Sequence, residues 1–144
     1  MEETRHDRIF DEKKDCRCAG SDDDQRLHHT GPEEYEKNVS YVVSELVKDG
    51  TKVIITTMPP YSQEKSSVCF AENRALFLEE SRQLYNGILA RVAENYNVVL
   101  NKMDERYAAY TPEELTLDDG IHLNAIGQDI LAEGVVESII NLIK

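Results

Sequence analysis

The apolar residues of this chain recur with two different periods. Helical spacing predicts three helices, over about 32–48, 71–94 and 125–143. Two short runs without alternation, at 52–58 and 98–100, predict strands that are buried on both faces, as in a parallel sheet. Helices that alternate with such strands predict an α/β fold.

Two polar stretches connect these elements. Residues 61–69 leave the carboxyl end of the first strand, where open α/β sheets place their ligand crevices, and 101–117 lead towards the last helix; both are expected to be loops. Gly87 interrupts the second helix and predicts a close approach of another element there. The apolar stripe of the last helix is expected to pack in the core. Its members are Ile126, Ile130, Leu131, Val135, Ile139 and Leu142.

Residues 1–29 have no hydrophobic period and are rich in charge, so a poorly ordered arm is expected before a domain of residues 30–144. The arm carries soft ligands at Cys16, Cys18, His28 and His29. Their spacing matches neither C-x-x-C nor a zinc finger, and scattered thiols and imidazoles are the favoured interpretation. A metal-binding protein that uses these four residues stays open as one alternative.

Acidic residues outnumber basic ones by 28 to 16, which gives a formal charge of −12. This charge repels phosphate backbones and anionic lipid, so nucleic acid is not an expected partner. No apolar run reaches the roughly 20 residues of a membrane span, and the charged start lacks a signal-peptide core. Three cysteines make a disulfide framework improbable, so a cytoplasmic location is expected.

Candidate chemistry gathers just before the last helix. Asp119 and His122 are three residues apart, with Gly120 between them to let the backbone turn, and Asn124 follows as an N-cap. A carboxylate that orients a histidine, which then takes a proton from a hydroxyl, is the acid–base half of a hydrolytic triad.

The string D-G-I-H-L-N-x-x-G at 119–127 resembles the last block of the SGNH (GDSL-type) esterases and lipases. The resemblance extends over about 20–144, because P-E-E-Y-E-K-N at 32–38, Gly50 and the strand that ends in Pro60 occur in that family's order. It implies a three-layer α/β/α, flavodoxin-like fold and a carboxylic ester hydrolase that acts on a small-molecule ester without a cofactor. His122 would be the general base and Asp119 the acid that orients it.

The chain departs from the family pattern in two places. Gly20-Ser21-Asp22-Asp23 stands where the family has Gly-x-Asn-Asp, so Asp22 replaces an oxyanion-donating amide with a carboxylate that only accepts. The Gly-Asp-Ser block that carries the nucleophile is absent, and ordinary loop hydroxyls are the favoured interpretation of Ser21, Ser62, Ser66 and Ser67.

Two expectations follow from the missing block. The parallel sheet should be incomplete at its N-terminal side, and its open edge should favour self-association. A non-catalytic remnant of the fold, or an interaction module, therefore stands beside the hydrolase as an alternative.

Overall fold

Two parallel strands, β1 (Ile54–Thr56) and β2 (Val99–Asn101), form the sheet of the computed structural model, which describes residues 31–69 and 78–144. They pair in register from Ile54 opposite Val99 to Thr56 opposite Asn101. The strand β1 is shorter than the run at 52–58 that predicted it, and β2 is shifted by one residue from the run at 98–100. The places of the two strands and their parallel direction are as expected.

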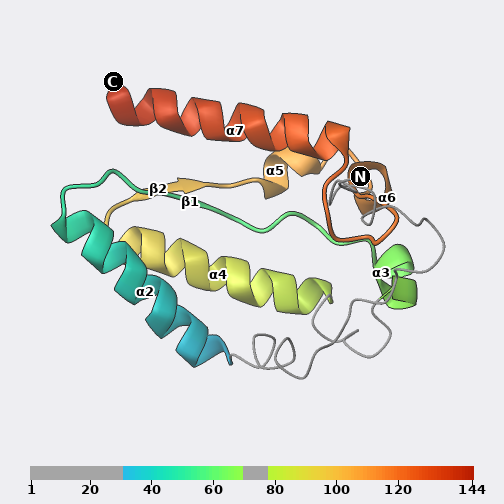
Figure 1. Ribbon diagram of the computed structural model, residues 1–144, viewed down its shortest axis with the longest axis horizontal. Coiled ribbons are helices and arrows are strands. Elements are labelled where there is room, and N and C mark those ends of the chain that lie inside the picture. Colours follow the sequence, from blue (N-terminus) through green and yellow to red (C-terminus); the bar gives the residue numbers. More distant parts are fainter. Residues whose placement is uncertain (1–30, 70–77) are drawn as a thin grey trace, which may run out of the picture.

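Helices cover both faces of this sheet (Figure 1). The helices α2 (Pro32–Lys48) and α4 (Glu79–Asn95) pack together on one face, and α7 (Ala125–Ile143) covers the other. The described residues thus form an α/β fold with a small parallel sheet in the middle of three layers. No helix in these residues is long and apolar enough to cross a membrane.

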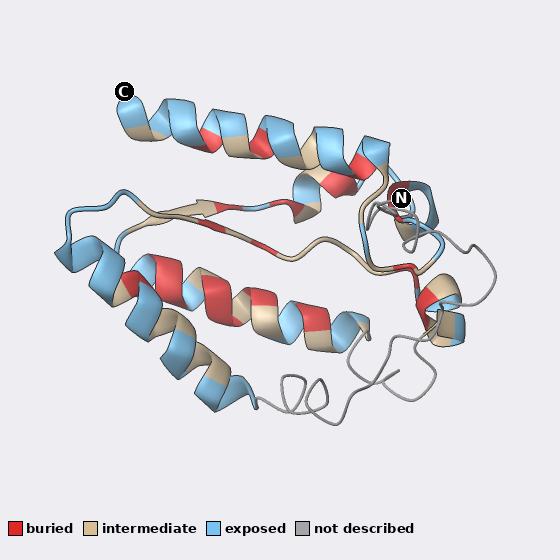
Figure 2. Ribbon diagram, viewed as in Figure 1, coloured by how far each residue is buried: buried red, intermediate tan, exposed pale blue. Residues whose placement is uncertain are grey.

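The core is divided between the two faces, and the buried residues follow the inner sides of the helices (Figure 2). One buried cluster lies between the sheet and helices α2 and α4; it contains Val43, Ile55, Ile88, Leu89, Val92 and Ala93. A second cluster lies beneath α7; it contains Met103, Tyr107 and Leu115, with Leu123, Ile130 and Leu131 against it.

The prediction that one apolar stripe of α7 packs in the core is partly wrong. Ile126 and Ile139 are exposed, and the buried positions are Gly127, Gly134 and Ser138. A Cβ atom on Gly134 would lie 2.7 Å from the Met103 sulfur, so the small residues let the helix come close to the segment after β2. Hydrophobicity alone does not reveal this kind of close packing. The prediction that another element packs closely against Gly87 is also wrong, since nothing lies within 4 Å of a Cβ built there.

Short helices interrupt both stretches that were expected to be loops. Residues 61–69 contain α3 (Gln63–Cys69), and 101–117 contain α5 (Asp104–Tyr107) and α6 (Pro112–Leu115). The helix α6 begins with a capping box, in which Thr111 and Glu114 satisfy each other's backbone and side-chain groups. These short helices hold the connections at the carboxyl ends of the strands.

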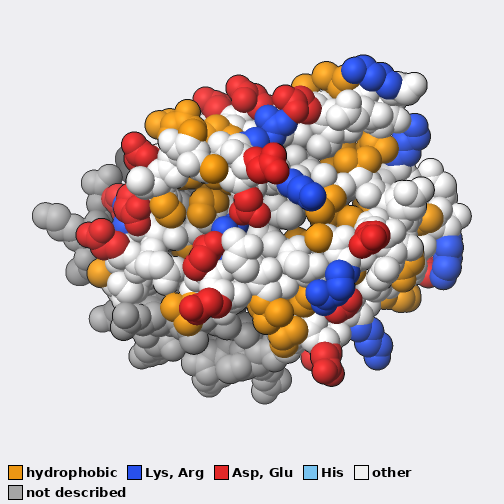
Figure 3. Space-filling model, turned by 180° about the vertical axis from the view of Figure 1, so that it is seen from behind, with side chains coloured by type: hydrophobic (Ala, Val, Ile, Leu, Met, Phe, Trp, Pro, Cys, Tyr) orange, Lys and Arg blue, Asp and Glu red, His pale blue; other side chains and the backbone are white. Residues whose placement is uncertain are grey.

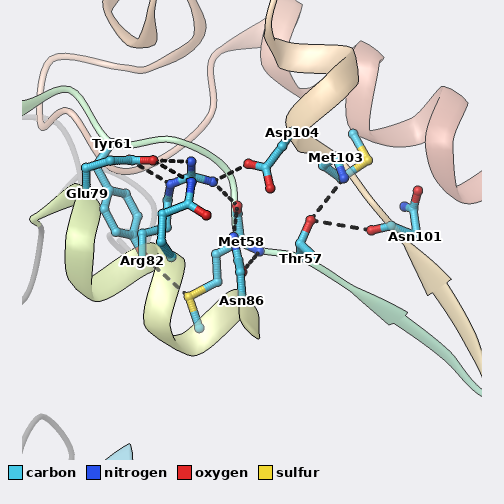
Figure 4. Close-up of polar contacts among 10 residues, drawn as sticks. Thr57, Met58, Tyr61, Glu79, Arg82, Asn86, Asn101, Met103 and Asp104 are labelled. Atoms are coloured by element: carbon cyan, nitrogen blue, oxygen red, sulfur yellow. Dashed lines mark hydrogen bonds and ion pairs between the residues drawn. The ribbon is translucent and has the colours of Figure 1, made fainter. Parts of the chain in front are cut away.

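The strand β1 ends because side chains of α4 capture the backbone at Met58 (Figure 4). The Asn86 amide accepts from the Met58 N–H at 2.7 Å and donates to its carbonyl at 3.2 Å, as a neighbouring strand would do. The Arg82 guanidinium donates to the same carbonyl at 3.0 Å, and it also pairs with Glu79 and with Asp104 after β2. These pairs hold the pKa of Arg82 above its ordinary value, so the buried guanidinium stays charged. This clamp fixes the direction in which the chain leaves the sheet.

Candidate active site

The segment between α6 and α7 folds back on itself as a tight loop. Thr116 and Leu123 form an isolated antiparallel bridge, and the Leu117 N–H donates to the His122 carbonyl at 2.8 Å. The turn needs Gly120, whose φ of +76° lies in the left-handed region that side chains disfavour. We call residues 116–123 the acid–base loop. Asn124 follows the loop as the N-cap of α7, and its side chain accepts from the Gly127 N–H at 3.0 Å.

The tight turn brings the two predicted catalytic side chains together. Asp119 Oδ2 lies 2.5 Å from His122 Nδ1. Asp119 Oδ1 accepts from the Ile121 N–H at 2.9 Å and from the His122 N–H at 3.0 Å. Both carboxylate oxygens are therefore fixed, one by the imidazole and the other by the backbone of the same turn.

This environment determines the charge of the carboxyl group. Partial burial of Asp119 favours the neutral acid, but the hydrogen bonds from Ile121 and His122 outweigh it and lower the pKa of Asp119 below its ordinary value. An ionised Asp119 accepts a hydrogen bond from Nδ1–H, which leaves the lone pair of the neutral ring on Nε2. The pair thus presents a basic nitrogen on the side of the ring away from Asp119.

The basic nitrogen is open to solvent. The His122 side chain is 73% exposed, against 28% for Asp119, and within the described ranges no hydrogen bond reaches Nε2. The ring is accessible, as a base that takes a proton from another molecule must be. It is also wetter than in a closed active site, where water is excluded.

The acid–base loop lies beyond the carboxyl ends of the strands, where open α/β sheets bind their ligands (Figure 1). The chain that leaves β1 enters α3 at Ser62, and the Ser62 N–H donates to the Gly120 carbonyl at 2.8 Å. A hydrogen bond from a residue that follows β1 therefore fixes the tip of the loop to this end of the sheet.

None of the serines beside the loop is presented as a nucleophile in the part of the chain that the structure describes. Ser62 has 0% exposure, and its hydroxyl caps α3 by accepting from the Lys65 N–H at 3.2 Å. Ser66 is buried, and Ser67 donates to the Glu64 carbonyl. The sequence favoured ordinary loop hydroxyls for these serines, whereas the structure places Ser66 and Ser67 inside α3 and Ser62 at its start. Ser21 lies outside the described residues.

The thiol of Cys69 at the end of α3 also lies close to the acid–base loop, since its sulfur donates to the Asp118 carbonyl at 3.8 Å. The predicted oxyanion residues, Gly20 and Asp22, lie outside the described residues. The same holds for the metal-ligand alternative of Cys16, Cys18, His28 and His29. Over 31–69 and 78–144, no cluster of His, Cys, Asp and Glu side chains could hold a metal ion.

A hollow of about 210 Å³ opens at the same end of the sheet, but neither His122 nor Asp119 lines it. Its walls are Pro60, Arg82, Gln83, Asp104, Tyr107, Ala108, Tyr110 and Pro112. Because catalytic chemistry requires contact with the base, we assign the candidate site to the acid–base loop and not to this hollow.

A small parallel sheet between helical layers, with a carboxylate–imidazole pair beyond its carboxyl ends, is the arrangement found in α/β hydrolases. The chain is similar in structure to LAE5, an alpha/beta hydrolase enzyme from the metagenome of Lake Arreo, Spain. The TM-score is 0.56 and the identity is 27%, over 76% of this chain and 48% of that one. The likeness supports a hydrolase fold, and the chain spans about half the length of LAE5. No protein-family model and no curated protein matches the chain.

Proposed function

We propose that this chain carries the acid–base half of an ester-hydrolase site of the SGNH type, with His122 as general base and Asp119 as the residue that orients it. The observation that carries the proposal is the contact of 2.5 Å between Asp119 and His122 Nδ1, in a loop at the carboxyl end of the parallel sheet. The likeness to LAE5 gives it independent support at the level of the fold.

The mechanism assigns a separate role to each ring nitrogen. Nδ1–H donates to Asp119, which keeps the ring in one tautomer and stabilises the imidazolium when it forms. Nε2 takes the proton of a serine hydroxyl as the oxygen attacks the ester carbonyl, and then returns that proton to the leaving alcohol. The serine must come from outside the described residues, because the serines within them that lie beside the loop have structural roles.

The resemblance to the SGNH hydrolases implies a small carboxylic ester as the substrate. A serine with a histidine base can hydrolyse such an ester without a cofactor. Asp22 would stand near the developing oxyanion if the resemblance holds there, and a carboxylate at that position would slow the reaction by repulsion.

Labelling with a fluorophosphonate probe, followed by intact-mass measurement, tests this function. We expect one adduct per chain, and we expect it to be abolished in His122→Ala. Asp119→Asn should slow labelling by on the order of 10⁴-fold, because the amide stabilises the wrong tautomer. Asp118→Asn is the matched control, since this neighbouring carboxylate is exposed and should be replaceable without effect.

The second candidate function is a non-catalytic interaction module that keeps this half of the fold, and the openness of the ring around Nε2 favours it. Its prediction for the same experiment is an intact chain with no adduct. A full adduct that survives His122→Ala would contradict both candidates, because the nucleophile would then be activated elsewhere.

We also propose that the chain self-associates. In the described part of the chain, β1 has β2 on one side and no strand on the other. The outer surface of α7 adds the exposed apolar side chains of Val136, Ile139, Ile140 and Ile143. Such an edge and such a surface favour association, although acidic side chains spread over the face in Figure 3 oppose it. Sedimentation at micromolar concentration should detect a dimer or larger species, and a cooperatively unfolding monomer would refute this proposal.

A further inference from the structure

Ser62 and Lys65, at the start of α3, hold α6 and the acid–base loop through four hydrogen bonds. The Lys65 ammonium donates to the carbonyl of Glu113 and to that of Thr116, each at 2.9 Å. Both acceptors belong to the end of α6, where backbone carbonyls lack partners within the helix. Thr116 is also the first residue of the acid–base loop, so Lys65 holds the base of that loop.

Ser62 makes the other two attachments. Its hydroxyl donates to Glu113 Oε1 at 2.9 Å, and its N–H donates to the Gly120 carbonyl at 2.8 Å. Because the same hydroxyl accepts from the Lys65 N–H, it also holds the turn that carries the ammonium in place. The end of α6, the base of the loop and its tip are thereby fixed to one helical turn.

The catalytic pair itself has few other attachments to the fold. Within the described residues, the Asp119 and His122 side chains form hydrogen bonds with each other and with the backbone of their own turn. The direction in which Nε2 points therefore depends on how the backbone of the acid–base loop is held. Asn124 holds the far end of the loop through the Glu114 carbonyl, and α3 holds the base and the tip.

We propose that Lys65 is a positioning residue for His122. It is the only group of that turn that brings a charge to the loop, and hydrogen bonds with an ionised donor are about twice as strong as neutral ones. An apolar side chain of similar length would leave two carbonyls without a donor and would free the base of the loop. The inference rests on the proposed role of His122 as a base, but its effect on the geometry can be measured without any activity.

Nitrogen-15 NMR of the His122 ring tests the proposal, with the resonance assigned by its loss in His122→Gln. We expect a single tautomer with the proton on Nδ1 in the parent chain at a pH where the ring is neutral. In Lys65→Met we expect the Nδ1 and Nε2 shifts to move towards each other as the tautomers mix. Lys65→Arg, which keeps the charge and several donors, should restore the parent shifts.

Lys52→Met is the matched control. The Lys52 ammonium also donates to one backbone carbonyl, that of Leu142 at 3.0 Å, but it ties the start of β1 to the end of α7. This variant should lose a similar contact and leave the His122 shifts unchanged. If Lys65→Met does not unfold cooperatively, Lys65→Gln takes its place, because the shorter glutamine side chain also removes the positive charge and stays polar.

The labelling experiment separates the two proposals. If labelling occurs, Lys65→Met should slow it by about 10²-fold, the usual consequence of a misplacement of about 1 Å. Changed shifts with no adduct in the parent chain would support Lys65 as a positioning residue and refute the hydrolase. Unchanged His122 shifts in Lys65→Met would overturn the role of Lys65, whether or not an adduct forms.

Discussion

Replacement of Gly120 by alanine should destabilise the chain strongly, because the turn of the acid–base loop leaves no room for a side chain. A Cβ there would lie 2.6 Å from the Ser66 backbone nitrogen and 2.8 Å from both the Ser62 carbonyl oxygen and the Lys65 Cβ. All three contacts are with backbone or with the first side-chain atom, so no flexible side-chain end can move aside. The residue must also keep a φ of +76°.

The expected magnitude has two parts. The left-handed backbone costs an alanine roughly 1–2 kcal/mol. Overpacking against the first turn of α3 costs about 1–3 kcal/mol more. Together they predict a loss of about 2–5 kcal/mol in the free energy of unfolding, against a typical total of about 5–15 kcal/mol for a domain.

Urea unfolding measures these losses, and substitutions of two other glycines separate the backbone cost from the overpacking cost. Gly50 has a φ of +75° but nothing within 4 Å of its Cβ, so Gly50→Ala should show the backbone cost alone. Gly87 lies inside α4 with open space around it, so Gly87→Ala should stabilise the chain by about 0.5–1 kcal/mol. If Gly120→Ala cost no more than Gly50→Ala, the inferred docking of the loop on α3 would be wrong.

Three further predictions concern the end of the sheet. Arg82→Met removes a buried donor from the Met58 carbonyl, and it should lower the free energy of unfolding, measured in urea, by about 1–3 kcal/mol. An unchanged free energy of unfolding would refute this prediction. Thr57→Val leaves the buried Met103 N–H without the acceptor that it has at 2.9 Å, and a similar loss of about 1–3 kcal/mol should appear as a lower melting temperature. The pKa of Asp119 lies below its ordinary value of 3.8, so its stabilising effect is complete above that value and is lost as the pH falls through the lowered pKa. An NMR titration of the Ile121 amide should place this step below pH 3.8, and a step above that pH would contradict the hydrogen-bonded geometry.

The sequence was most informative where elements are long and buried on one side. The helices α2 and α7 and both strands lie close to where the hydrophobic pattern places them. The helix α4 begins at Glu79, after the extended residue Leu78, although the prediction began at about residue 71. The signal for α6 was present but was not used: Thr111, Pro112 and Glu114 form a capping box with proline in the first turn. The helix α3 has only the N-cap Ser62 as a signal, and α5 has none comparable to a capping box. Tertiary contacts hold such short segments more than propensity does.

The sequence predicted the two side chains of the candidate site but not the contacts that hold their loop in place. Asp119 and His122 are three residues apart in the sequence, and one glycine turn is enough to bring them together. Lys65 and Ser62, which hold that turn, are more than fifty residues away along the chain and match no motif. Contacts of this kind follow from how the exit of β1 meets the end of α6, and local sequence does not encode that meeting.

The two ends of β1 are completed in different ways. At the carboxyl end, the Asn86 amide and the Arg82 guanidinium occupy the backbone groups of Met58, so this end needs no further strand. Further back, over Ile54–Thr56, no strand in the described residues covers the outer edge. The contacts that support the Asp119–His122 pair thus lie within the described residues, whereas under the proposed function the nucleophile, and any strand that covers this edge, must come from outside them. The geometry of His122 should therefore hold even if the described residues alone cannot complete a catalytic site.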